Sequence, residues 1–126
     1  MMNNMVGWFE IPVLDMERAK IFYETVFNIK IHIEDFKELK MGWFPWEEGK
    51  PGAAGSLVFH KEWYKPSERY GPLLYFSSDD VQNEIAKIES SGGKIIQPKT
   101  LIKEDIGYMA VFLDTEGNRI ALHSRK

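Results

Sequence analysis

The sequence carries a turn and then a strand-like segment at residues 114–124, Asp114-Thr115-Glu116-Gly117-Asn118-Arg119-Ile120-Ala121-Leu122-His123-Ser124. Successive side chains of a strand point to opposite faces of a sheet. Ile120 and Leu122 therefore share one apolar face. The opposite face is mixed and carries Arg119, Ala121 and His123. This pattern predicts a strand that covers a core on one side and lines a site on the other.

An earlier segment, residues 52–60, has the same pattern, and it belongs to an internal repeat. Several pairs of landmarks are separated by one constant spacing along the chain: Asp15 and Asp80, Asn28 and Gly93, Trp43 and Tyr108, Gly52 and Gly117, Leu57 and Leu122. Each match alone is weak, but one constant offset across several landmarks indicates a duplicated structural unit.

The first unit is predicted over residues 5–60 and contains one helix. Residues 5–13 alternate as a strand does. Asp15 is the expected N-cap of a helix that runs to about Phe27, and Asn28 is its expected left-handed stop. The apolar stripe of this helix is formed by Ala19, Phe22, Tyr23 and Val26. Three further strands are expected at 29–33, 39–43 and 52–60.

The second unit is predicted over residues 71–126, after a polar linker at 61–70. It is expected to contain a strand at 73–77 and a helix that is capped by Asp79 or Asp80 and ended by Gly92-Gly93. Proline cannot donate to a strand ladder, so we expect the strand that begins at Ile95 to stop at Pro98. A charged loop at 99–105 and strands at 107–113 and 118–124 complete the unit.

Together these elements predict a single α+β domain, residues 1–126, built from two tandem β-α-β-β-β units. The length of 126 residues suits one domain with a substantial core. The composition, 44% hydrophobic and 28% charged, is that of an ordinary globular protein.

Charge and hydropathy exclude several classes of partner. The net charge is −3, from 16 basic and 19 acidic residues, and no basic run is present. Nucleic acid and anionic membranes are therefore not expected as partners. No apolar stretch approaches the roughly 20 residues of a membrane span, and Met1–Met5 does not resemble a signal peptide, so a cytoplasmic location is expected. The absence of cysteine excludes disulfides, zinc–thiolate sites and cysteine nucleophiles.

Three motifs carry a resemblance to a known superfamily. They are Asp15-Met16-Glu17-Arg18-Ala19-Lys20-Ile21-Phe22-Tyr23, Gly92-Gly93-Lys94, and Asp114-Thr115-Glu116-Gly117-Asn118-Arg119-Ile120. With the paired β-α-β-β-β pattern, they make the chain resemble the vicinal oxygen chelate superfamily, which contains glyoxalase I, extradiol dioxygenases, and fosfomycin- and bleomycin-resistance proteins. The resemblance implies two curled sheets around a shared cleft, with the helices outside, and commonly a homodimer.

The resemblance also implies where a metal would be bound. Metal-binding members place one ligand on the first strand and one on the fourth strand of each unit. Those positions here hold Trp8, Ser56, Leu73 and Ala121. Tryptophan, leucine and alanine offer no donor to a hard divalent cation, and a serine hydroxyl is a feeble one. We therefore expect no metal and no other cofactor.

The expected cleft is formed by the strand faces that point away from the helices. The faces expected to point toward the helices carry Phe9, Ile11, Leu57, Leu74, Phe76, Ile120 and Leu122. The faces of the cleft carry Trp8, Glu10, Ser56, Val58, His60, Leu73, Tyr75, Ala121 and His123. An apolar and aromatic surface with a few polar groups is typical of a small-molecule site. A barrel interior filled by its own side chains is the alternative interpretation.

Glu10 is the most informative residue of this surface, because a carboxylate on an interior face must be paired or hydrogen-bonded. A structural pair with Arg119, His123 or a backbone group would satisfy it. In a functional role, Glu10 would act as a base or hold a cationic ligand group, with His123 as its proton partner. A metal site made of Glu10, His123 and His60 is a further alternative, although these residues lie one pleat beyond the family positions.

The sequence therefore leaves three functions open. The leading hypothesis is a metal-independent glyoxalase/bleomycin-resistance-like protein that binds a small, partly apolar organic molecule in an aromatic-lined cleft. The first alternative is an isomerase or lyase that uses Glu10 and His123 as acid/base groups. The second alternative is a divalent-metal lyase of the glyoxalase I type.

Overall fold

The computed structural model describes residues 4–126 and contains eight strands and two α-helices in that range. In chain order the elements are β1 (Trp8–Pro12), α1 (Met16–Phe27), β2 (His32–Asp35), β3 (Lys40–Trp43), β4 (Ala54–Phe59), β5 (Leu74–Ser77), α2 (Val81–Ile88), a 3-10 turn (Glu89–Ser91), β6 (Lys94–Lys103), β7 (Gly107–Leu113) and β8 (Arg119–Ser124). This is the predicted α+β arrangement of two β-α-β-β-β units.

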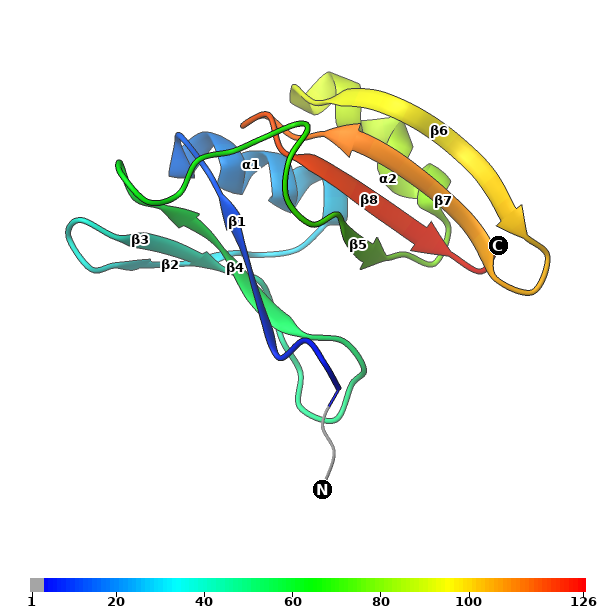
Figure 1. The fold of residues 1–126 in the computed structure, drawn as a ribbon, viewed down its shortest axis with the longest axis horizontal. Coiled ribbons are helices and arrows are strands. Elements are labelled where there is room, and N and C mark those ends of the chain that lie inside the picture. Colours follow the sequence, from blue (N-terminus) through cyan, green and yellow to red (C-terminus); the bar gives the residue numbers. More distant parts are fainter. Residues whose placement is uncertain (1–3) are drawn as a thin grey trace.

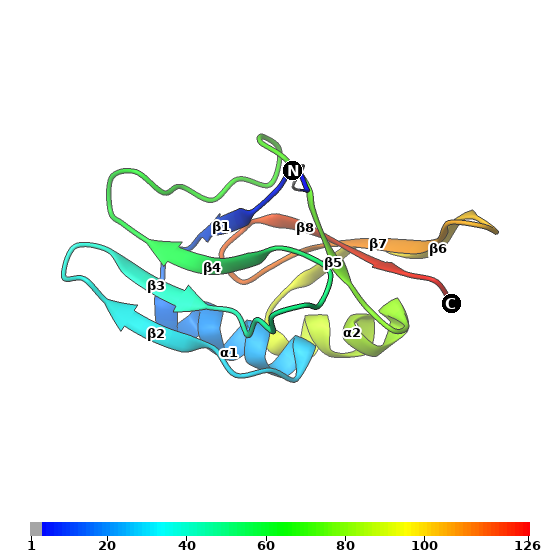
Figure 2. The same ribbon diagram turned by 90° about the horizontal axis from the view of Figure 1, so that it is seen from below.

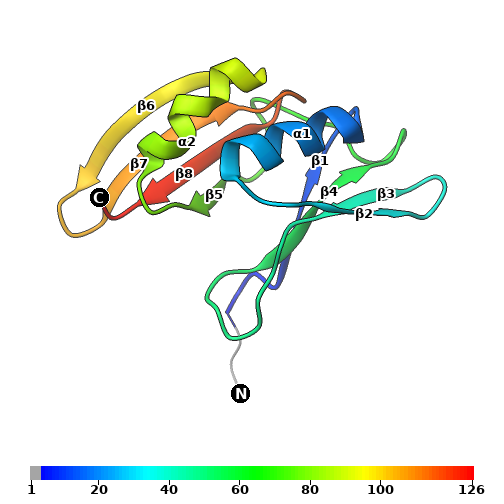
Figure 3. The ribbon, with the colours of Figure 1, turned by 180° about the vertical axis from the view of Figure 1, so that it is seen from behind.

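The strands form two four-stranded mixed sheets with the same topology. Their strand orders are β1-β4-β3-β2 and β5-β8-β7-β6, and in each sheet the first pair is parallel while the others are antiparallel. The sheets remain separate and do not close into a barrel. Both helices lie on the same side of the sheets (Figures 1 and 3), and Figure 2 shows them in one layer beside the strands.

The registers confirm the internal repeat and refine it. Phe9 pairs with Gly55, and Leu74 pairs with Ile120, so the two parallel pairs are related by the predicted constant spacing.

The third strands do not keep this spacing. Trp43 pairs with Ser56, whereas Val111 pairs with Ala121, the repeat partner of Ser56. The counterpart of Trp43 is therefore Val111, and the predicted match to Tyr108 is wrong. The reason is that the loop between β3 and β4 is longer than the loop between β7 and β8. The extra residues shift β3 along the sequence relative to its counterpart β7.

The helix signals in the sequence correspond to observed caps. The Asp15 side chain accepts a hydrogen bond from the Arg18 backbone N–H at the start of α1, and Asn28 ends this helix in the left-handed conformation at φ 54°. Of the two candidate caps for α2, the structure selects Asp80, whose side chain accepts from the Gln82 backbone N–H. Gly92, at φ 102°, ends the helical segment of the second unit.

Two predicted strand boundaries were wrong. The strand expected at 29–33 begins only at His32 and runs to Asp35. Pro98 does not stop β6, which continues to Lys103 and includes most of the predicted charged loop. The strand tolerates proline because β6 is at the edge of its sheet and its pairing with β7 shifts register on both sides of this position.

The core lies between the helices and the two sheets, and both units contribute to it. Its fully buried large side chains include Phe22, Tyr23, Phe112, Leu57 and Leu122. The expected stripe of α1 supplies the helical part: Ala19, Phe22, Tyr23 and Val26 are all buried. Among the described residues no helix could cross a bilayer, since the longer one has only 12 residues.

The turn at 114–118 connects the second unit to the first. Glu116 accepts hydrogen bonds from the backbone N–H groups of Leu14 (2.8 Å) and Asp15 (2.9 Å), and the Arg18 guanidinium donates to both of its carboxylate oxygens at 2.8 and 2.9 Å. Asp114 accepts from the Tyr23 hydroxyl at 2.7 Å. This turn therefore holds the beginning of α1 through buried carboxylates.

Candidate functional site

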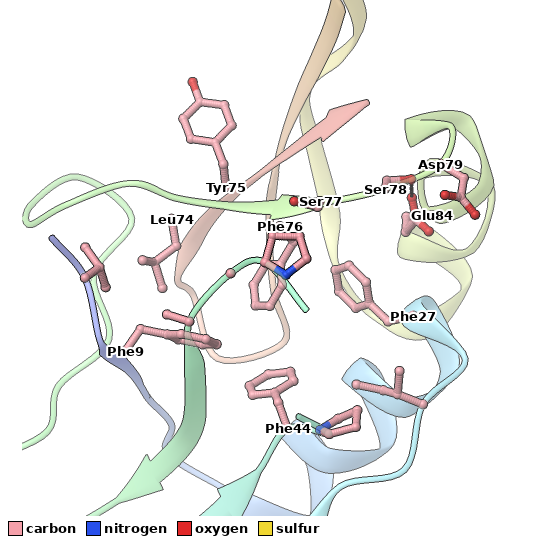
Figure 4. A pocket seen from close by; sticks show the side chains of 16 residues that line it. Phe9, Phe27, Phe44, Leu74, Tyr75, Phe76, Ser77, Ser78, Asp79 and Glu84 are labelled. Carbon is pink, nitrogen blue, oxygen red and sulfur yellow. Dashed lines mark hydrogen bonds between the residues drawn. The ribbon is translucent and has the colours of Figure 1, made fainter. Parts of the chain in front are cut away.

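A pocket of about 720 Å³ lies between the end of α1, the connector before β4, and β5. Its wall is largely aromatic and contains Phe9, Phe27, Phe44 and Phe76, with Leu74 beside them. Figure 4 shows the four rings grouped around the space, from β1, α1, the segment after β3, and β5. The volume lies within the range of about 300–1,000 Å³ that is usual for small-molecule sites.

The rings of the pocket support one another. The Phe76 ring centroid lies 5.7 Å from that of Phe9, 5.0 Å from that of Phe27 and 5.5 Å from that of Phe44. Rings at these separations stabilise each other beyond simple burial. Phe76 is therefore the centre of a preformed aromatic wall that both units share.

Gly55 in β4 leaves the space that the Phe9 ring occupies. A Cβ atom at this glycine would lie 2.3 Å from two carbons of the ring. Real Cβ atoms do not approach other atoms so closely, so any larger residue at 55 would displace Phe9. The absence of a side chain at Gly55 in β4 thus determines where the Phe9 ring of β1 lies in the pocket wall.

The opposite end of the pocket is polar. It is formed by Ser77, Ser78, Asp79 and Glu84, which lie at the end of β5 and in the first turn of α2. The Ser78 hydroxyl donates to the Glu84 carboxylate at 2.5 Å (Figure 4). The pocket therefore combines an aromatic wall with an acidic end.

Most of the residues predicted for the site lie outside this pocket. Tyr75 lines it, but its ring points away from the phenylalanine rings in Figure 4. Ser56, Val58 and Ala121 are completely buried and offer no surface to a ligand in this conformation. Leu73, just before β5, is half-buried. Of the residues that form the wall, Phe9, Leu74 and Phe76 were instead predicted to face the helices, and they do pack against the core.

The first sheet brings a different group of predicted residues together. Trp8 and Trp43 meet edge to face with ring centroids 6.2 Å apart. The Trp8 indole N–H donates to Glu10 at 3.3 Å, and the Tyr64 hydroxyl donates to the same carboxylate at 2.5 Å. This hydrogen bond, together with burial, raises the pKa of Tyr64. Tyr64 belongs to the predicted linker, and no periodic pattern in the sequence pointed to it.

Glu10 and His123, the predicted acid/base pair, have separate partners. Glu10 is satisfied by Trp8 and Tyr64 rather than by Arg119, His123 or the backbone. His123 donates its Nε2–H to the Ile106 carbonyl at 2.7 Å. The Nδ1 atom of His60 accepts the backbone N–H groups of Glu62 and Trp63, at 3.1 and 3.3 Å.

The donor set does not fit the metal centre that the family resemblance implies. The four family positions hold Trp8, Ser56, Leu73 and Ala121, of which only serine has a side-chain oxygen. Its hydroxyl is buried and has no hydrogen-bond partner among the residues that the structure describes. Within residues 4–126, no three His, Asp or Glu side chains lie close enough together to hold a metal ion.

The fold, the duplicated topology and the pocket can be compared with known proteins. A sequence model of the glyoxalase/bleomycin resistance protein/dioxygenase superfamily matches residues 5–122, which is nearly the whole described chain. The chain belongs to this superfamily. Its match spans both units, in agreement with the repeat.

Two similar proteins match the chain over almost its whole length. A glyoxylase-like domain-containing protein of Didymella fabae is 27% identical over 128 residues, which cover 98% of this chain and 96% of that protein. The structure of TnmS3, an antibiotic binding protein from Streptomyces sp. CB03234, is 26% identical and has a TM-score of 0.65; the match covers 100% of this chain and 99% of that one.

A mutant of glyoxalase I from Zea mays has the same fold. It superposes with a TM-score of 0.72 at 17% identity. The match covers 94% of this chain but 46% of the maize chain, so the protein spans about half the length of that enzyme. This likeness concerns the fold alone.

Proposed function

We propose that the protein binds a small, partly apolar organic molecule in the aromatic pocket between its two units, without a metal. The observation that carries this proposal is the 720 Å³ space walled by Phe9, Phe27, Phe44 and Phe76. The rings hold one another in place before a ligand arrives, so binding costs little side-chain entropy.

Two further observations support a binding role. TnmS3, which matches the chain from end to end, is an antibiotic binding protein. In addition, the side chains at the family's metal positions suit a binding protein better than a metal-dependent lyase, because three of the four have no ligating atom. The lyase of the glyoxalase I type therefore gains no support from this site.

A thermal-shift screen of apolar amines, alcohols and carboxylates tests the binding role. A compound present at 100 times its dissociation constant should stabilise the protein by about 2.7 kcal/mol, which is several degrees in Tm. We expect compounds with an aromatic or alicyclic body to raise Tm. A screen in which no such compound raises Tm at millimolar concentration would contradict the proposal.

The acid/base alternative, an isomerase or lyase using Glu10 and His123, stays a prediction. The hydrogen bonds of these two residues run to Tyr64, Trp8 and the Ile106 carbonyl, so no observed contact links them as a pair. The other predicted ligand contacts, including His60 and Leu73, likewise remain predictions.

We also propose that the protein forms a homodimer through the sheet faces opposite the helices. Trp8, Trp43 and Tyr75 lie there with 43%, 42% and 52% of their surface exposed. The two tryptophans belong to β1 and β3 of the first sheet, and Tyr75 belongs to β5 of the second. Large exposed aromatic side chains of this kind are typical of a protein–protein interface. A second copy that covers these faces would bury them.

Light scattering tests the homodimer. We expect the mass of two subunits for the wild-type protein, and a shift toward one subunit for Trp43→Glu, which places a charge in the exposed aromatic pair. The matched control is Trp46→Glu, since Trp46 is exposed but lies after the end of β3. A wild-type mass of one subunit at all concentrations would contradict the homodimer.

A further inference from the structure

The acidic end of the aromatic pocket indicates which class of ligand it accepts. Asp79 and Glu84 are the charged residues that line the pocket, and no Lys, Arg or His among the described residues does so. An unbalanced pair of carboxylates at one end of an aromatic space disfavours anions and favours cations.

Within residues 4–126, no basic side chain forms an ion pair with either of these carboxylates. The neighbouring Asp80 forms an ion pair with Lys99 at 2.9 Å, and this contact lowers the pKa of Asp80. Within the described part of the chain, Asp79 and Glu84 form no ion pair. The hydrogen bond that Glu84 accepts comes from the Ser78 hydroxyl, an uncharged donor that supplies no positive charge.

The beginning of α2 does not offer a competing anion site, because the backbone N–H groups of its first turn already donate hydrogen bonds within the protein. The Val81 N–H donates to the Ser124 hydroxyl at 3.1 Å, and the Gln82 N–H donates to the Asp80 side chain at 3.0 Å. The Asn83 N–H donates to the Asp80 carbonyl at 2.9 Å. An anion at this end would therefore have no available N–H donor in the first turn of α2 and would lie next to two carboxylates.

We infer that the ligand of this pocket is an organic cation, a protonated amine carried on an aromatic or alicyclic body. This inference rests on the proposed binding function. The apolar body packs against Phe9, Phe44 and Phe76, and the ammonium group donates to Glu84. Phe27 lines the pocket between these groups in Figure 4, so its ring is in contact with the same space.

Three probes with the same naphthalene body separate charge from shape: 1-naphthylmethylamine and the isosteric 1-naphthylmethanol, and the similarly sized anion 1-naphthoate, measured by isothermal titration calorimetry at pH 7. We expect the amine to bind about tenfold or more tightly than the alcohol, since one charge-assisted hydrogen bond is worth at least about 1.4 kcal/mol. The carboxylate should bind most weakly.

Glu84→Gln is the decisive variant, because glutamine keeps the size of the side chain and an acceptor for Ser78 but removes the charge. We expect the affinity of this variant for the amine to fall to that for the alcohol, while its affinity for the alcohol is unchanged. The matched control is Glu89→Gln, an exposed residue beyond the end of α2 that does not line the pocket. This control should keep the preference. Asp79→Asn provides a second test if Glu84→Gln does not fold.

The outcomes distinguish the charge inference from the binding role. Equal affinities for amine and alcohol in the wild-type protein, or an unchanged preference in both Glu84→Gln and Asp79→Asn, would overturn the charge inference and leave the binding role intact. Failure of all three probes to bind would count against the pocket itself and so against the proposed function.

Discussion

Replacement of Glu116 by alanine is expected to lower the free energy of unfolding by about 3 kcal/mol, because this side chain satisfies several donors at once. The Leu14 and Asp15 backbone N–H groups would lose their acceptor at the entry to α1. The Arg18 guanidinium would lose its bidentate partner. Two other hydrogen bonds between this turn and the first unit would remain, from Asn118 to the Pro12 carbonyl and from the Tyr23 hydroxyl to Asp114.

Urea unfolding followed by circular dichroism measures this effect, which corresponds to a fall in Tm of roughly 10 °C. The matched control is Glu48→Ala at an exposed turn, which should change stability by less than about 0.5 kcal/mol. A Glu116→Ala variant as stable as this control would show that the turn does not hold the two units together.

The effect of Glu116→Ala should also depend on pH. Burial acts to raise the pKa of Glu116, but the hydrogen bonds from Arg18, Asp15, Thr115 and Leu14 outweigh it, so the pKa lies below its ordinary value of 4.5. A carboxyl whose pKa is lowered by folding stabilises the protein above its unfolded pKa and loses that contribution as the pH falls through the folded pKa. The difference between wild type and Glu116→Ala should therefore be largest near neutral pH and shrink below about pH 4.5.

Gly55→Ala is expected to disrupt the pocket and to destabilise the fold by about 1–3 kcal/mol. Its new methyl group would lie 2.3 Å from the Phe9 ring, which must then move. Phe9 packs against Phe44 and Phe76 with ring centroids 5.6 and 5.7 Å away, so its displacement disturbs the pocket wall. We expect the affinity for 1-naphthylmethylamine to fall at least tenfold.

Gly7→Ala is the matched control for this change. Gly7 immediately precedes β1, and a Cβ atom there would meet nothing within 4 Å. The control should retain both the stability and the probe affinity of the wild type. Equal affinities in Gly55→Ala and Gly7→Ala would mean that the ligand does not contact the wall that Phe9 forms.

The sequence was sufficient for the fold because its signals are local and are repeated. Asp15 and Asn28 mark the ends of α1 by cap chemistry, and both act as predicted. Gly52 and Gly117, which occupy equivalent places in the repeat, both adopt positive φ angles, at 103° and 91°. A turn that requires the left-handed region is readable in one sequence because few residues other than glycine adopt it.

The boundary errors have a physical cause that no local pattern reveals. Pro98 was expected to end its strand, but an edge strand with a shifted register needs no N–H at that position. The shift of the third strand likewise depends on the length of the connector after Trp43. Edge position and register are properties of the assembled sheet, so residue spacing along one segment does not determine them.

The pocket was harder to predict than the fold. Alternation correctly grouped Phe9, Leu74 and Phe76 on the core side of their strands, but it could not show that the two units leave a space beside them. The contact from Tyr64 to Glu10 joins residues that are distant in the chain and comes from a segment without periodicity. Such features depend on how segments distant in the chain pack against each other, whereas strand alternation describes each segment alone.

A crystal structure of the protein with bound 1-naphthylmethylamine would show directly whether the aromatic pocket is the binding site. We expect the naphthalene ring to contact Phe9, Phe44 and Phe76, and the ammonium group to lie within hydrogen-bond distance of the Glu84 carboxylate. A ring stacked instead on Trp8 and Trp43, on the sheet face away from the helices, would contradict the pocket assignment.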